Sequence, residues 1–161
     1  MSPRKKASYS SKPSGPKPGV SQACRLPEDG GDKDVIARIF AMKTIAVVGC
    51  SPKSERPSHY VAEYLKEQGY RIIPVNPGHE TILGEKCYPS LSAIPEAVDV
   101  VEVFRRPEEA PAVIEEAIKI GAKALWLQDG ITYPPGEAAA RKKGILVVSN
   151  DCMMRRHLTG A

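Results

Sequence analysis

A glycine followed by hydroxyl-bearing and cationic residues ends a short β-branched run near position 49. The run 44–48 leads into Gly49, Cys50, Ser51, Pro52, Lys53, Ser54, Glu55 and Arg56. Glycine lets the backbone turn tightly, and the amides of such a turn, with the N-terminus of a following helix, form a partially positive pocket for phosphate oxygens. Ser51 can add a hydroxyl, and Lys53 and Arg56 can add full charges. The pattern predicts a site for a ligand that carries phosphate groups.

The turn keeps the spacing of the dinucleotide-binding pattern Gly-x-Gly-x-x-Gly but not its composition. The three positions are Gly49, Ser51 and Ser54. An NAD-binding domain also places an acidic residue at the end of its second strand, to bind the ribose hydroxyls. This chain has Val75, Asn76 and Pro77 there. NAD is therefore disfavoured, and the simplest alternative is a tight turn with no ligand.

Two later strand ends carry further groups that suit a nucleotide ligand. Phe104 is followed by Arg105 and Arg106, so an aromatic face that can stack on a base stands beside guanidinium groups that can hold a phosphate. Ordinary core packing is an equal alternative for Phe104, because it closes an apolar strand. After the next strand, Gln128 is expected to face the same crevice, whereas Asp129 either caps a turn or repels an anionic ligand.

Strands and helices alternate along the part of the chain that must position these residues. Hydrophobic runs without polar alternation predict strands at 44–49, 71–75, 99–104, 122–127 and 145–149, with a short uncertain one at 86–88. Helical spacing and end signals predict helices at 32–42, capped by Asp32, at 58–68, capped by Ser58, at 107–120 and at 135–143. The expected fold is α/β, a Rossmann-like doubly wound, mainly parallel sheet in the order 3-2-1-4-5-6, with helices on both faces and ligands at the carboxyl ends of its strands.

Composition divides the 161-residue chain into a tail and one domain. Residues 1–31 contain six Lys or Arg and two acidic residues, which accounts for the net charge of +4, and they have few large apolar residues. We expect 1–31 to be a disordered basic tail, with a basic arm for an acidic partner or nucleic acid as the alternative, and 32–161 to be a single domain. The balanced charge of that domain gives no general nucleic-acid footprint.

The location predicted for the protein is the cytoplasm. No apolar run approaches the length that spans a membrane, and no apolar stretch of signal-peptide length follows the first charged residues. Cys24, Cys50, Cys87 and Cys152 are far apart, which is typical of reduced thiols. Redox chemistry at Cys50 or Cys152, such as a mixed disulfide with a thiol ligand, is an alternative to small buried thiols.

At these residues the chain resembles the stand-alone CoA-binding domain proteins, which share their fold with the CoA-binding domain of the succinyl-CoA synthetase α-subunit. The resemblance implies a site for coenzyme A or an acyl-CoA. Gly49, Cys50, Ser51 and Pro52 would lie near the diphosphate, with Lys53 and Arg56 as cationic partners. Val75, Asn76 and Pro77 would lie beside the adenosine, and Phe104, Arg105 and Gln128 around the crevice. The matching stretches are residues 45–53, 56–58, 69–77, 84–91, 99–106, 125–131 and 150–153.

The expected function is binding of CoA or acyl-CoA without catalysis. The synthetase uses an active-site histidine on a second domain, which this chain is not expected to contain, and His59, His79 and His157 are interpreted as single surface residues. No Ser/His/Asp set, paired carboxylates or metal cluster stands out in the sequence. An NAD(P)-dependent oxidoreductase and an interaction protein with a vestigial nucleotide site remain alternatives, and a protein partner or homo-oligomer is left open.

Overall fold

Five short apolar strands form one parallel sheet in a computed structural model that describes residues 33–159. All four strand pairings are parallel, and nearly every strand residue is buried. The α/β fold expected from the sequence is confirmed. The predicted tail and the Asp32 cap lie outside the described residues. The strands are β3 (Thr44–Val48), β4 (Arg71–Val75), β7 (Val100–Val103), β8 (Ala124–Leu127) and β9 (Leu146–Val148).

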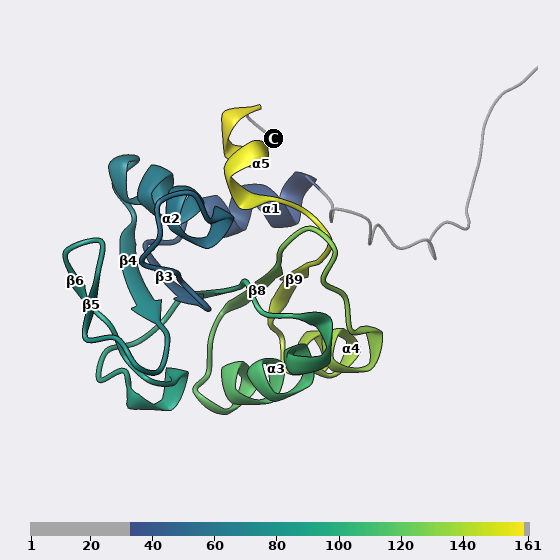
Figure 1. Ribbon diagram of the computed structural model, residues 1–161. Helices are drawn as coiled ribbons and strands as arrows, with labels where there is room; N and C mark the ends of the chain where they lie inside the picture. Colours follow the sequence, from purple (N-terminus) through teal and green to yellow (C-terminus); the bar gives the residue numbers. More distant parts are fainter. Residues whose placement is uncertain (1–32, 160–161) are drawn as a thin grey trace, which may run out of the picture.

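Helices cover both faces of this sheet (Figure 1). One layer contains α1 (Lys33–Phe40), α2 (Pro57–Glu67) and the C-terminal α5 (Met153–Leu158). The other contains α3 (Ala110–Lys119) and α4 (Pro134–Lys142). Successive strand side chains point to opposite faces, so each strand supplies both layers and must be apolar throughout.

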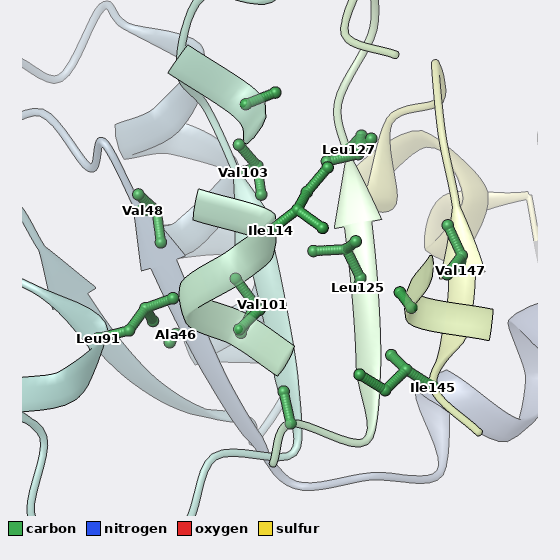
Figure 2. Close-up of a cluster of buried hydrophobic side chains, with 14 of the residues drawn as sticks. Ala46, Val48, Leu91, Val101, Val103, Ile114, Leu125, Leu127, Ile145 and Val147 are labelled. Atoms are coloured by element: carbon green, nitrogen blue, oxygen red, sulfur yellow. The ribbon is translucent and has the colours of Figure 1, made fainter. Parts of the chain in front are cut away.

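Two hydrophobic clusters result from this alternation. Ile45 and Val47 of β3 pack in the cluster with α1, α2 and α5, whereas Ala46 and Val48 pack in the cluster with α3 and α4. Figure 2 shows the second cluster, where Ile114 of α3 meets the β8 side chains. The sheet is thus held in place from both sides.

The strand order is β4-β3-β7-β8-β9, which corrects the predicted six-strand order. The expected third strand at 86–88 is missing from this sheet, although the five remaining strands follow one another as predicted. Tyr88 makes only an isolated parallel bridge to Val75. Pro89 follows it and has no N–H to extend the pairing. The preceding residues instead form a small antiparallel hairpin of β5 (Thr81–Ile82) and β6 (Glu85–Lys86).

Several element ends and one helix also differ from the sequence prediction. Ser58 lies inside α2, whose N-cap is Arg56 without a side-chain cap. The helix predicted from Pro107 begins with the 3-10 turn η3 (Pro107–Glu109) before α3. The sequence prediction missed α5 and the 3-10 turn η2 (Leu91–Ala93). Both are shorter than two helical turns, so they carry too little periodicity to be recognised.

Candidate functional site

The turn between β3 and α2 lies directly against the end of β7. Gly49 has φ +88°, and a Cβ placed on it would lie 2.6 Å from the backbone oxygen of Phe104. The Phe104 N–H donates to the oxygen of Val48 at 2.9 Å. Only glycine satisfies both the left-handed backbone and the close approach. The chain leaves β3 for β4 on one side and then returns from β4 to β7 on the other side of β3, so this junction is the switch point where such sheets bind ligands.

Side chains from α2 and from the residue after β4 fix the shape of the turn. The Ser51 N–H donates to Ser58 Oγ at 3.0 Å, and His59 Nδ1 donates to the Ser51 oxygen at 2.8 Å. Asn76 Nδ2 donates to the Cys50 oxygen at 2.8 Å. Sequence reasoning missed Ser58 and His59, because their role depends on contacts across the turn. His59 is half-buried and hydrogen-bonded, which corrects its interpretation as a surface residue.

The amides of this turn differ in their availability for a ligand. The Gly49 N–H donates to the Val75 oxygen at 2.8 Å, and the Lys53 N–H donates to Ser51 Oγ at 3.1 Å. The Arg56 N–H donates to the Lys53 oxygen at 3.1 Å, so together with Ser51 four of the turn amides are occupied. The N–H groups that have no acceptor among residues 33–159, and so remain for an anion, are those of Cys50, Ser54, Glu55 and Ser58.

Four cationic side chains lie near the turn and the β7 end, in two different states. Lys53 and Arg56 are exposed, and neither forms an ion pair with any described residue. Arg105 Nε lies 3.6 Å from Glu109 Oε1. Arg106 contacts Glu108 and Glu109 at 3.7 and 3.3 Å. Lys53 and Arg56 therefore have charge that is not already neutralised within the described chain.

A cavity of about 450 Å³ opens beside the turn, at the carboxyl ends of β7 and β8. Of the predicted site residues, Phe104, Arg105 and Gln128 line it. The residues 49–53, Arg56 and 75–77 are outside its lining. Segments from α2, from the loops after β7 and β8, and from the start of α5 supply the rest: Pro57, Tyr60, Val61, Arg106, Pro107, Asp129, Gly130, Ile131 and Cys152.

Two of the predicted site residues have side chains in the hydrophobic core. Cys50 is fully buried, its Sγ donates to the Ser58 oxygen at 3.6 Å, and burial raises its pKa to about 12. Val75 is buried in the layer below α3 and α4. Pro77 is exposed and precedes a second cavity of about 850 Å³, which starts at Gly78 and lies beside the β5–β6 hairpin.

Asp129 is neutralised locally. Both of its oxygens accept from the Arg155 guanidinium, at 3.0 and 2.9 Å, and this contact lowers the pKa of Asp129. Arg155 also contacts Asp151, which in turn pairs with Arg156 at 2.6 Å. The ion pairs join the loop after β8 to α5. The ion pair with Arg155, an α5 side chain, differs from the turn cap that the sequence offered for Asp129.

His157 connects α5 to the rest of its layer. Its Nδ1 lies 2.7 Å from Tyr64 Oη, and its ring packs edge-on against Phe40, Tyr64 and Tyr70. It is half-buried rather than a single surface residue, which is a second correction to the interpretation of the histidines.

One carboxyl group lies in the sheet beneath the site. Glu102 of β7 is 0 % exposed, and neither of its oxygens has a hydrogen-bond partner. Burial raises the pKa of Glu102 to about 8. Its signal in the sequence is an acidic residue inside the apolar strand Val100–Val103.

Other site types were also sought in the part of the chain that the structure describes. No three His, Cys, Asp or Glu side chains there are grouped closely enough to hold a metal ion. None of the helices between residues 33 and 159 combines the length and apolar character needed to cross a membrane. Cys50, Cys87 and Cys152 are free thiols.

Similar proteins show what this architecture is related to. YneT, an uncharacterised protein of Bacillus subtilis, is 38 % identical over 125 residues, which are 78 % of this chain and 90 % of YneT. The structure of a hypothetical protein from Pyrococcus horikoshii OT3 has 41 % identity and a TM-score of 0.77, covering 84 % of this chain and 95 % of that one.

A longer relative is the ADP-forming acetate–CoA ligase II of Archaeoglobus fulgidus. It is 31 % identical over 114 residues, which are 69 % of this chain but only 17 % of the ligase. The CoA binding domain family matches residues 43–157. On this match, the chain belongs to the CoA-binding domain family and is homologous to the corresponding domain of these ligases.

Proposed function

We propose that this chain binds coenzyme A or an acyl-CoA at the β3–α2 turn and in the adjoining cavity, without catalysis of its own. The observation that carries this proposal is the contact of Gly49 with the backbone of Phe104. It brings the predicted phosphate turn to the cavity wall formed by Phe104 and Arg105. One ligand can then contact both.

The charges around the turn suit the diphosphate of CoA. Lys53 and Arg56 have no ion pair within the described residues, and the first turn of α2 contains no acidic side chain. The N–H groups of the turn that have no acceptor among residues 33–159 add hydrogen-bond donors. A helix N-terminus with cations and free amides attracts phosphate oxygens.

The cavity suits the pantetheine arm. Its lining includes the apolar or aromatic side chains of Tyr60, Val61, Phe104 and Ile131, with Gln128 as a polar group. Pantetheine is a chain of methylene and amide groups, so it needs apolar contact with a few hydrogen bonds. Val75, Asn76 and Pro77 remain our proposed neighbours of the adenosine.

Binding without catalysis is the simpler proposal because Asp129 and His59, which could act as an acid or a base, have structural partners. Asp129 is paired with Arg155, and His59 is held by the Ser51 oxygen. The ligase relative is far longer than the segment it shares with this chain. A cytoplasmic location, where CoA and reduced thiols coexist, is part of the proposal.

Isothermal titration calorimetry with CoA tests the proposal. Lys53→Ala and Arg56→Ala should each weaken binding by about 1–3 kcal/mol, the value of a charge-assisted hydrogen bond. Lys142→Ala, at an exposed lysine in the last turn of α4, is the matched control and should bind like the unmodified chain. Unchanged affinity in both test variants would place the phosphates elsewhere.

The same titration separates the alternatives. NADH should give no heat, because the end of β4 offers Asn76, whose amide is already bonded to Cys50, instead of a ribose-binding carboxylate. Binding of NADH but not CoA would favour the oxidoreductase. Binding of neither would favour the interaction protein with a vestigial site.

A further inference from the structure

Cys152 is the thiol that lines the cavity. It is half-buried, lies just before α5 and lines the same cavity as Phe104 and Arg105. Cys50 and Cys87 are buried, and burial raises the pKa of both thiols, which suppresses their reactive thiolate form. Among the described cysteines, Cys152 alone is placed to meet a ligand in this cavity.

Gln128 places a hydrogen-bond donor beside this thiol. Gln128 is 5 % exposed, and its Oε1 accepts from the Met153 N–H at 3.1 Å. The residue lines the cavity, and its Nε2 donates to no group in residues 33–159. Nε2 is not sealed inside the protein, so its two N–H groups are available to a ligand carbonyl that enters the cavity.

Gln128 and Cys152 are connected through the backbone at the start of α5. Met153 N belongs to the peptide group that follows Cys152, so the Gln128 amide lies one peptide group away from the thiol-bearing residue. A ligand carbonyl that accepts from Gln128 would therefore have its neighbouring atoms close to the sulfur of Cys152. In pantetheine, an amide carbonyl precedes the thiol by a few bonds.

We propose that Cys152 is a thiol–disulfide exchange site for CoA, and that Gln128 positions the pantetheine arm beside it. This inference rests on the proposed function, because it requires the pantetheine arm to enter the cavity. It adds a covalent, reversible state in which the protein carries CoA as a mixed disulfide.

The exchange balances without an added oxidant when the reactant is CoA disulfide. Cys152 loses its proton to solvent, and its thiolate attacks one sulfur of the CoA–S–S–CoA bond. A Cys152–S–S–CoA bond forms while the original S–S bond breaks. The second CoA leaves with the electron pair and takes up a proton. One disulfide is consumed and one is made, and excess thiol reverses the reaction.

Intact-protein mass spectrometry after incubation with CoA disulfide tests the inference. All variants carry Cys24→Ser, because Cys24 lies outside the described residues. We expect one CoA adduct per chain, removed by dithiothreitol and absent in Cys152→Ser. Cys87→Ser, at a buried thiol outside the lining of this cavity, should keep the adduct. Adduct formation should be at least about tenfold faster than with glutathione disulfide at the same concentration, because binding holds the reacting sulfurs together.

Competition shows whether the reaction occurs in the cavity. Desulfo-CoA, which lacks the reacting sulfur, should slow adduct formation with CoA disulfide, because it fills the cavity that Cys152 lines. Equal rates with the two disulfides, or no effect of desulfo-CoA, would identify Cys152 as an ordinary exposed thiol and overturn the inference.

Calorimetry on the same Cys24→Ser protein separates this inference from the proposed function. CoA binding without an adduct on Cys152 would refute the exchange site alone. Absence of CoA binding would refute the proposed function as well.

Discussion

At the scale of single residues, the buried Glu102 makes stability depend on pH. Burial raises its pKa in the folded chain to about 8, against 4.5 for the ordinary group. Between these values the folded state keeps a proton that the unfolded state releases, so stability should fall as pH rises from about 4.5 to 8, and stay low above it. In the unmodified chain the free energy of unfolding should be lower at pH 8 than at pH 5 by on the order of 2–4 kcal/mol. Glu102→Gln should remove this difference. Urea unfolding at both pH values measures the free energy of unfolding.

Glu63→Gln, at an exposed position on α2, is the control for the same chemical change. If Glu102→Gln kept the same pH dependence of stability as the unmodified chain, the Glu102 carboxyl would ionise freely in the folded state.

At the scale of elements, the β3–α2 turn depends on its contact with β7. Gly49 and Gly144 have similar positive φ, +88° and +82°, but only Gly49 has backbone within reach of an added Cβ. Gly144→Ala should cost about 1–2 kcal/mol, from backbone conformation alone. Gly49→Ala should cost more and also weaken CoA binding, because the clash with the Phe104 oxygen separates the turn from the cavity. Thermal unfolding measures the stability of the two variants, and calorimetry measures their CoA binding. Equal losses of stability in Gly49→Ala and Gly144→Ala would mean that the close approach of Gly49 to Phe104 is unimportant.

At the scale of the whole molecule, both helical layers share one sheet and should unfold together. Leu65 of α2 and Ile114 of α3 are buried in different clusters, on opposite faces of the same five strands. Leu65→Ala and Ile114→Ala should each destabilise by about 2–5 kcal/mol, as buried aliphatic truncations do. Because the strands belong to both clusters, each variant should lower a single transition, seen alike by calorimetry and circular dichroism. Two separate transitions would show that the layers are independent.

The sequence by itself determined the alternating elements and the region of the candidate site. Apolar runs such as 71–75 predict buried parallel strands because both of their faces must be covered. Glycine after β3 marks a tight turn, and Phe104, Arg105 and Gln128 were expected around one crevice because carboxyl ends of parallel strands meet at one edge. These inferences need only local pattern and chirality.

Only the tertiary structure decided which distant groups meet. Ser58 supports Ser51, Arg155 neutralises Asp129, and Gln128 is fixed beside Cys152. The sheet also stops at β4, because Tyr88 makes one bridge and no more. Such contacts join residues whose separation along the chain carries no signal of their distance in space. They are set by how α2, α5 and the loops pack on the sheet, and that packing is a property of the whole chain.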